Sequence, residues 1–332
     1  MYVINTALLP SSGRCYGAGT LGGLETPVAL MMFNRPDLTA QVFEAIRAAR
    51  PKRLLIVADG PRTDAEREKT EATRAMIKVD WPCELETNYA EQNMGCKRRV
   101  GSGISWVFER CEDAIVLEDD TLPSPSFFPY CQQLLARYRD DERVMCIGGL
   151  NLVPNPHPRG PETYYFSRYG ATHGWASWRR AWKFFDLDMS AWPEFKRSGR
   201  MADLFRRRVE RWFWTILFDA QYEGRISTWD YQWLFARLTQ GGLTAVPSVN
   251  LVRNLGFRAD ATHHDFKMPK AWRAALEHHD LWDLVEPQYV LPDREMDAYY
   301  FDEIWNPRGA PGVAWFGIRD FRDKLRAQRS AR

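Results

Sequence analysis

Three consecutive carboxylates, Glu118, Asp119 and Asp120, follow directly after the apolar run Ala114 to Leu117. Adjacent acids repel one another beside a core, so we expect a cation to compensate them. Mg²⁺ and Mn²⁺ bind through one or two carboxylates and complete their coordination with water and substrate phosphate. The alternative is that the acids form a turn or cap a helix that begins near Pro123 to Ser126. The triplet alone does not separate these two interpretations.

Short apolar runs in the first half of the chain alternate with amphipathic stretches. The stretches predict helices that begin at Pro36, at Asp64 and after Gly95. The apolar runs predict strands at 27–33, 54–58, 83–87 and 114–117. Strands separated by helical crossovers build a parallel sheet. The predicted fold is therefore α/β, with a Rossmann-like, mostly parallel central sheet flanked by helices.

Polar side chains follow the ends of these strands. In open α/β sheets, ligands bind outside the carboxyl ends of the strands, so these residues would gather at one edge. An Asp there can accept the imide N–H of a uracil-like base, and an Arg or Lys at a helix start can neutralise a diphosphate. Each residue alone could close a loop or solvate a helix, but their joint position favours a site. The residues are Asn34, Arg35, Asp59, Asn93, Lys97, Arg98 and Arg99.

The second half of the chain contains further strand patterns and a change of pattern after His173. Strands are predicted at 144–150, 163–166 and 243–252. The segment His173 to Trp178 is expected to lead into a helix that continues through Phe185.

Two later stretches have helical patterns. Residues 201–222 carry Arg206 to Arg208 together with several aromatic residues. Such a helix could meet an anionic acceptor or a membrane surface. An ordinary surface helix with one buried apolar face is favoured instead. A further helix is expected after Tyr289.

Composition and charge exclude some function classes. The 332-residue chain has 45 Lys and Arg against 43 Asp and Glu, so no global field indicates a nucleic-acid partner. Its six cysteines form no C-x-x-C pair and no zinc spacing, which is typical of a reducing, cytoplasmic compartment. No signal peptide or membrane span is expected. The basic end, residues 319–332, is expected to be a solvated, fraying helix, although it could dock weakly on anionic lipid at the inner membrane face.

Four motifs stand in order along the chain: Phe33-Asn34-Arg35-Pro36, Ala58-Asp59-Gly60, Asn93 to Arg99, and Leu117 to Asp120 followed by Phe127-Phe128. Together they resemble the nucleotide-sugar glycosyltransferases of the GT-A fold. The sequence is similar to the inverting N-acetylglucosaminyltransferase I type and to bacterial family-two-like sugar transferases. In those enzymes the acidic triplet is the DXD element.

The resemblance spans about residues 27–264 and implies a domain organisation. Residues 1–26 would form a loose leader before the GT-A domain. Residues 27–122 would be its nucleotide-sugar-binding half and residues 123–264 its helical, acceptor-side half. Residues 265–332 would form a C-terminal helical extension.

The resemblance also implies roles for individual residues. Asp120 would ligate Mn²⁺ or Mg²⁺, Asp119 would touch the donor ribose or sugar, and Lys97 or Arg98 would help to neutralise the diphosphate. The residues that would bind the donor are Phe33, Asn34, Arg35, Asp59, Asn93, Lys97, Arg98, Glu118, Asp119, Gly174 and Trp175.

Three candidate residues of the second half each have a structural alternative. Trp175 could stack on a sugar face or anchor a helix in the core. Asp230 would be the general base, ahead of Glu118 and Asp188, although an acid in a first helical turn is also expected for the helix dipole alone. His263 could ligate the metal or touch phosphate, or it could simply be a solvated loop residue.

These assignments predict a metal-dependent, inverting glycosyltransferase of polysaccharide biosynthesis. It would move a hexosyl or N-acetylhexosaminyl group to a glycan, lipid-linked or small-molecule acceptor. A UDP-sugar donor is favoured because Asp59 suits uracil, although thymine has the same imide face. One alternative is a nucleotidyltransferase, which usually has a Gly-rich basic signature after the first strand that is not seen here. The other is a nucleotide-sugar-binding module without catalysis.

Overall fold

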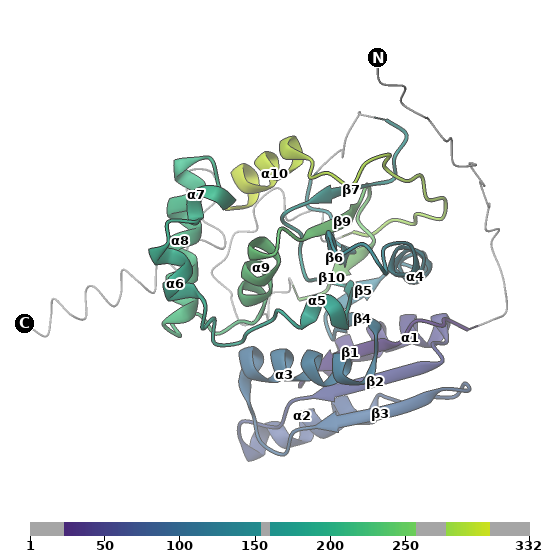
Figure 1. Cartoon of the computed structure of the whole chain (residues 1–332). Helices are drawn as coiled ribbons and strands as arrows, with labels where there is room; N and C mark the ends of the chain where they lie inside the picture. Colours follow the sequence, from purple (N-terminus) through teal and green to yellow (C-terminus); the bar gives the residue numbers. More distant parts are fainter. Residues whose placement is uncertain (1–22, 154–159, 257–276, 306–332) are drawn as a thin grey trace, which may run out of the picture.

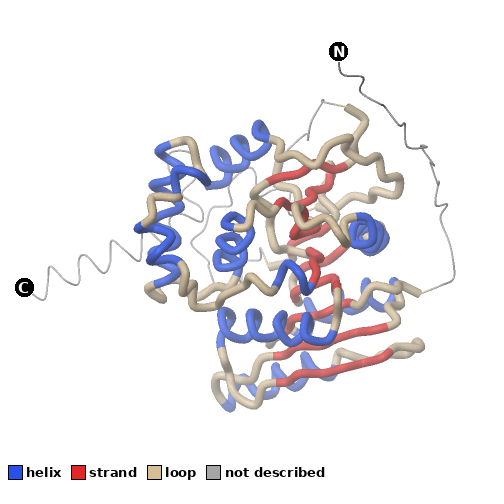
Figure 2. The backbone as a smooth tube through the Cα atoms, in the orientation of Figure 1, coloured by secondary structure: helices blue, strands red, loops and turns tan. Residues whose placement is uncertain are grey.

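The computed structural model describes residues 23–153, 160–256 and 277–305. These residues build an eight-stranded sheet with the strand order β3-β2-β1-β4-β8-β6-β9-β7. Figures 1 and 2 show the sheet as a layer through the middle of the molecule, with helices around it. Its strands are β1 (Val28–Met32), β2 (Arg53–Ala58), β3 (Glu84–Tyr89), β4 (Asp113–Glu118), β6 (Val144–Gly148), β7 (Tyr164–Ser167), β8 (Trp175–Trp178) and β9 (Leu243–Pro247).

The first half of the sheet is parallel, as the sequence predicted. β1 pairs in parallel with β2 and β4, and β2 pairs in parallel with β3. The residues of β1 are buried on both faces, which is typical of a strand inside a parallel sheet. The crossovers are the helices α1 (Pro36–Ala49), α2 (Asp64–Ala75) and α3 (Gly95–Arg110). The α/β class with a mostly parallel, Rossmann-like central sheet flanked by helices is confirmed.

The second half of the sheet is mixed, which the sequence did not predict. The residues of β8 were expected to lead into a helix, but β8 pairs antiparallel with both β4 and β6. All four of its residues are buried, so both faces of the strand lie in the core. Only the short helix α5 (Arg179–Trp182) follows it. β7 is antiparallel to β9 at the outer edge.

A small second sheet lies beside the large one. The predicted strand 243–252 is divided into β9 and β10 (Val252–Asn254), and β10 pairs antiparallel with β5 (Thr121–Pro123). β5 follows the acidic triplet immediately, and the helix α4 (Phe127–Arg137) comes next. The β5–β10 pair therefore holds Thr121–Pro123, which follow the triplet, against Val252–Asn254.

Helices cover both faces of the large sheet. One apolar core lies between the sheet and α1 and α4, where Leu30, Ile56 and Val42 are fully buried. The opposite core lies between the sheet and α3, α5 and α9 (Asp230–Thr239). Helix α9 also faces a third cluster, so it joins the sheet to the helical lobe that Figure 1 shows on the left.

The helical lobe differs from the single helix predicted at 201–222. That helix is interrupted at Phe205, whose backbone is extended with φ −128° and whose ring is fully buried. The three arginines predicted on the helix therefore stand at the interruption and at the start of its second part. The helices of the lobe are α6 (Trp192–Arg197), α7 (Met201–Leu204), α8 (Arg208–Tyr222), α10 (Arg294–Tyr300) and a π-helical turn (Phe301–Trp305).

The segment 277–305 packs on the rest of the fold. Asp293 caps α10 by accepting from two backbone N–H groups, and its own N–H donates to the carbonyl of Phe166 on β7. Phe301 is fully buried in the lobe. The predicted boundary between residues 264 and 265 lies outside the described residues. In the described ranges, no helix has the length and apolar character that a membrane span requires.

Candidate functional site

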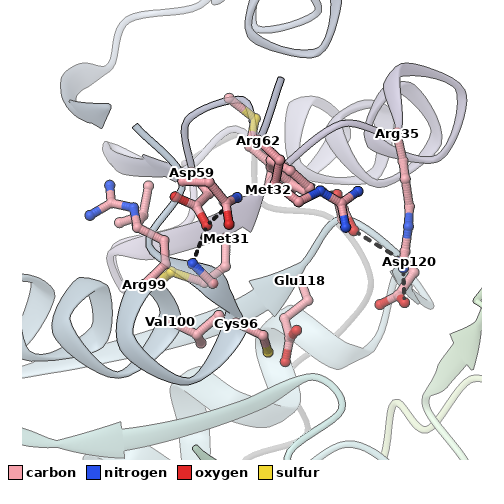
Figure 3. A pocket seen from close by; sticks show the side chains of 15 residues that line it. Met31, Met32, Arg35, Asp59, Arg62, Cys96, Arg99, Val100, Glu118 and Asp120 are labelled. Carbon is pink, nitrogen blue, oxygen red and sulfur yellow. Dashed lines mark hydrogen bonds and ion pairs between the residues drawn. The ribbon is translucent and has the colours of Figure 1, made fainter. Parts of the chain in front are cut away.

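A cavity of about 280 Å³ lies at the carboxyl ends of β1, β2 and β4 (Figure 3). The register places Met32 beside Ala58 and Met31 beside Glu118, so these strand ends meet at one edge of the sheet. This is the edge at which open α/β sheets bind ligands. The lining residues are Met31, Met32, Phe33, Arg35, Val57, Asp59, Arg62, Asn93, Gly95, Cys96, Arg99, Val100, Glu118, Asp119 and Asp120.

The acidic triplet forms one wall of this cavity. Asp119 is buried, and its Oδ2 accepts from the N–H of Phe33 at 3.1 Å, which ties β4 to the end of β1. Burial, followed by the charge of Asp120, raises the pKa of Asp119 to about 7. Burial and the charges of Asp120 and Asp119 hold the pKa of Glu118 well above its usual range. The triplet therefore concentrates negative charge that its surroundings only partly compensate.

Arg35 compensates part of this charge. Its Nη1 lies 2.8 Å from Asp120 Oδ2 and 3.5 Å from Asp119 Oδ1. The Arg35 side chain is 40% exposed and that of Asp120 is 20% exposed, so the ion pair is not isolated from water. Asp120 thus lines the same cavity as Asp59 without being locked in a dry salt bridge.

The donor set at the triplet fits a hard divalent cation. Carboxylate oxygens are the ligands that Mg²⁺ and Mn²⁺ prefer. Among residues 23–153, 160–256 and 277–305, no group of three or more His, Cys, Asp or Glu is arranged to hold a metal ion. Mg²⁺ nevertheless needs only one or two carboxylates when substrate phosphate and water supply the remaining ligands. The predicted ligand His263 lies outside the described residues.

Asp59 has a different task from the predicted one. Its Oδ1 accepts from the N–H groups of Gly60 and Met94, both at 2.8 Å. Its Oδ2 accepts from the side chain of Asn93 and the N–H of Gly95, both at 3.0 Å. A carboxylate has about four acceptor positions, and these four donors use them. A base imide would have to displace one of them, so Asp59 here fixes the loop before α3.

Phe33 lines the cavity together with Arg62, a cation that the sequence analysis missed, whereas Asn34 is not among the lining residues. The Arg62 guanidinium lies over the Phe33 ring, 5.2 Å from its centroid. Glu66 accepts from Arg62, and it also accepts from the Asn34 amide at 2.5 Å. The signal was present in the sequence, because Arg62 follows Asp59 by three residues, just after the end of β2.

The basic cluster at the start of α3 divides into two groups. Arg99 lines the cavity, but its guanidinium donates to the carbonyls of Ala58 and Asn88, so it fixes the ends of β2 and β3. Lys97 and Arg98 lie in the first turn of α3 and are not among the lining residues.

Asp230 is brought close to the acidic triplet although it is distant in sequence. It begins α9, and the hydroxyl of Thr228 donates to its carboxylate. Burial raises its pKa. Its negative charge is in turn one of the causes that raise the pKa of Glu118. Asp230 is not among the residues that line the cavity, but an acid with a raised pKa close to Glu118 is a candidate for proton transfer.

Cys96 is a second residue that the sequence analysis missed. Cys96 is exposed at the cavity, but desolvation by the surrounding protein atoms and the charges of Glu118 and Asp230 raise the pKa of its thiol to about 12, so the thiol is neutral at ordinary pH. Cys96 and Glu118 point toward the same part of the cavity (Figure 3). No pattern in the sequence separated Cys96 from the other cysteines.

Trp175 takes the core role, not the stacking role. Its side chain has no exposed surface, and its ring stacks on Trp229 with centroids 5.8 Å apart. A ring without exposed surface cannot cover a sugar face. Gly174 has a φ of +62°, and a Cβ there would lie 2.6 Å from a methyl group of Val252. Gly174 therefore allows the chain before β8 to pack closely against β10. It is not among the residues that line the cavity.

The chain between β10 and residue 257 runs along the triplet. The N–H of Leu255 donates to the carbonyl of Asp120 at 2.7 Å. A Cβ on Gly256 would lie 2.5 Å from Asp120 Oδ2, so only a glycine fits beside this carboxylate without a shift. The described range 160–256 thus ends next to Asp120, seven residues before His263.

Comparison with models of known protein families gives no match, and comparison with curated proteins gives none either. Among solved structures, the mannosyltransferase PcManGT from Pyrobaculum calidifontis in complex with GDP-Man and Mn²⁺ is 12% identical, with a TM-score of 0.37. The match covers 66% of this chain and 70% of that one. UDP-glucose pyrophosphorylase complexed with UDP-glucose is 11% identical, with a TM-score of 0.30, over 49% of this chain and 80% of that one. Similarities this low do not indicate a function, which must be argued from the site.

Proposed function

We propose that this protein is a metal-dependent glycosyltransferase that uses a nucleoside-diphosphate sugar. The observation that carries the proposal is the position of three carboxylates beside a cavity at the carboxyl ends of β1, β2 and β4, with Asp230 close by. Such an edge is where α/β sheets bind nucleotides. The cavity combines apolar side chains from the strands with cations at its entrance, which suits a ligand with a flat ring and a charged diphosphate.

A divalent cation would be held by Asp120, with Asp119 beside it. When bound, Mn²⁺ or Mg²⁺ would offset negative charge on the leaving diphosphate. The raised pKa values of Glu118 and Asp119 support this assignment, because burial and then the neighbouring carboxylates disfavour their ionised forms, which a bound cation would stabilise. Arg35 would add a second positive charge near the diphosphate, and its planar guanidinium suits phosphate oxygens.

Asp230 would act as the general base of a single displacement. An acceptor hydroxyl oxygen would attack the anomeric carbon of the donor sugar, and the bond from that carbon to the diphosphate would break. The bonding electrons would leave with the nucleoside diphosphate, and the hydroxyl proton would pass to Asp230. The configuration at the anomeric carbon would then be inverted. The raised pKa of Asp230 supports this role, since a base is most effective with a pKa nearer neutrality.

The nucleobase is less constrained than the sequence suggested. The argument for uracil required a free Asp59 carboxylate. Four donors at 2.8–3.0 Å already bind this carboxylate, so the argument no longer favours uracil. We therefore propose a nucleoside-diphosphate sugar donor with the base left to experiment, and a hydroxyl group of a glycan, lipid-linked or small-molecule acceptor.

Calorimetry with UDP, GDP, TDP and CMP, each with and without Mn²⁺, tests the proposal. We expect one nucleoside diphosphate to bind in a Mn²⁺-dependent manner, and Asp120→Ala to reduce its affinity at least about tenfold with the fold retained. The matched control is Asp113→Ala, which changes an acid at the opposite end of β4. Incubation of the wild type with the matching nucleotide sugar should release nucleoside diphosphate.

Two results would contradict the proposal. Unchanged nucleotide and Mn²⁺ affinity in Asp120→Ala would remove the metal site. Formation of a nucleoside triphosphate from the nucleotide sugar and pyrophosphate, without any sugar transfer, would indicate nucleotidyl transfer instead.

A further inference from the structure

The exposed face of α8 and the loop before it carry cations and an exposed tryptophan. Trp212 is 52% exposed and Val209 is 36% exposed, whereas the opposite face of α8 is buried in the lobe. Arg206 and Arg208 are exposed beside them. We define Arg206, Arg208, Val209 and Trp212 as the basic aromatic face. It lies at the end of the molecule away from α4 (Figure 1).

The charge of this face is not neutralised by the part of the chain that is described. Neither Arg206 nor Arg208 has a described carboxylate within ion-pair distance, whereas the neighbouring Arg207 pairs with Asp302. Glu210 in the first turn of α8 is buried, and the two acids at and just after the other end of the helix have partners. Asp219 is paired with Lys196 at 2.7 Å and Glu223 with Arg225 at 2.7 Å. A surplus of positive charge therefore remains at the first turns of α8.

The sequence that follows residue 305 is also basic. Trp305, the last residue before 306, packs on Trp214 of α8 with ring centroids 5.4 Å apart. The chain therefore continues from the side of α8. Its final residues, 319–332, contain six Lys and Arg against two Asp. The sequence of residues 319–332 thus contains more basic residues than the basic aromatic face itself holds.

We propose that the basic aromatic face docks this protein on the surface of an anionic lipid bilayer. Arginines attract anionic headgroups, and a tryptophan with an apolar body and a polar N–H is suited to the boundary between headgroups and acyl chains. An amphipathic helix that lies in this boundary presents basic and aromatic side chains together. The near-zero net charge of the whole chain, +2, argues against a general affinity for polyanions. The site cavity is not part of this face, so the proposal does not depend on the proposed function.

Sedimentation of the full-length protein with vesicles tests the proposal. We expect it to bind vesicles of equal parts phosphatidylcholine and phosphatidylglycerol at low salt, to bind phosphatidylcholine vesicles at least about tenfold more weakly, and to be released by salt. Arg206→Glu with Arg208→Glu should lower the partition coefficient at least about tenfold, because each basic residue near an anionic surface contributes about fivefold. Trp212→Ser should lower it about fivefold.

Matched variants separate this face from general effects. Trp282→Ser changes a tryptophan of similar exposure, 54%, in the segment that packs near α4. Lys69→Glu with Lys78→Glu reverses two exposed charges on and just after α2. Both control variants should bind vesicles as the wild type does. Should the charge-reversed α8 variant fail to fold, Trp212→Ser decides the question.

Three outcomes would overturn the proposal. The first is a wild type that stays in the supernatant with anionic vesicles at low salt. The second is an equal loss of binding in the α8 variants and their controls, which would indicate net charge or general hydrophobicity. The third is a concentration-dependent dimer in analytical ultracentrifugation that Trp212→Ser dissociates, since this would assign the face to a second copy of the chain.

Discussion

The Arg35 guanidinium forms an ion pair with the carboxylate of Asp120, in which Nη1 lies 2.8 Å from Oδ2. Asp120 is also the residue through which we expect a divalent cation to bind. The guanidinium and the cation would therefore compete for the same oxygens. Because Arg35 is the residue before α1 and lines the cavity, a cation at Asp120 would free its guanidinium for the diphosphate.

Replacing Arg35 should strengthen metal binding in the absence of nucleotide. We expect Arg35→Gln to bind Mn²⁺ about fivefold more tightly, since a partly exposed ion pair contributes up to about 1 kcal/mol. Electron paramagnetic resonance of free Mn²⁺ measures this affinity directly. Arg67→Gln, which changes an exposed arginine of α2 that pairs only with Asp64 at 3.2 Å, is the control. Equal Mn²⁺ affinity in wild type and Arg35→Gln would show that the guanidinium does not compete.

The loop before α3 should depend on Asp59. Asp59→Asn replaces one acceptor oxygen by an NH₂ group. This group would face the two N–H donors that the oxygen had accepted from, and it cannot accept from them. We expect a loss of about 2 to 3 kcal/mol in the free energy of unfolding, because buried donors lose charged partners. Urea denaturation measures the loss, and hydrogen exchange should accelerate at Met94 and Gly95. Asp64→Asn, at an exposed acid, should change neither quantity. Normal stability combined with lost nucleotide binding would instead assign Asp59 to the base.

The parallel half of the fold was predictable because its signals are local. β1 and β2 are uninterrupted apolar runs with polar residues directly after them, and the register of parallel strands brings those residues to one edge. The position of the acidic triplet followed from the same pattern. β8 was missed because four residues buried on both faces show no alternation, so a strand and a buried helical turn look alike.

The roles of individual site residues were less predictable than their positions. Asp59 was placed at the correct edge, but three of its four donors come from Asn93, Met94 and Gly95, a loop 34 to 36 residues later, and no local pattern records these contacts. Trp175 was undecided because amphipathic rings serve cores and sugar sites alike. Its burial depends on Trp229, which is distant in sequence. Tertiary contacts between distant loops therefore decided both assignments.

The ion pair between β7 and α10 should stabilise the fold more than an exposed pair does. Asp297 is buried, its Oδ2 accepts from Arg168 at 2.8 Å, and its Oδ1 accepts from the hydroxyl of Ser167 at 2.6 Å. Asp297→Asn should lower the free energy of unfolding by about 2 kcal/mol, since the partly exposed Arg168 and the buried Ser167 hydroxyl both lose a charged acceptor. The control, Asp302→Asn, breaks an exposed pair with Arg207 and should cost under about 1 kcal/mol. Similar urea midpoints for the two variants would contradict this difference.

The Thr228 hydroxyl controls the charge of Asp230. Burial raises the pKa of Asp230 above the ordinary value of an aspartate, and the hydrogen bond from Thr228 lowers it again because it stabilises the ionised carboxylate. A general base must be ionised to accept a proton. Activity should therefore be lost as the pH falls through the raised pKa of Asp230. Removing the hydroxyl should raise this pKa further.

Thr228→Val should consequently move the acidic limb of the pH profile of kcat/KM to higher pH. We expect a shift of roughly 0.5 to 1 pH unit, because a hydrogen bond to a charged group contributes about 1.5 kcal/mol and one unit corresponds to about 1.4 kcal/mol. Activity well above the limb should change little. Ser227→Ala removes an exposed neighbouring hydroxyl and should leave the profile in place. A shift toward lower pH, or the same profile for Thr228→Val and wild type, would assign the acidic limb to a group other than Asp230.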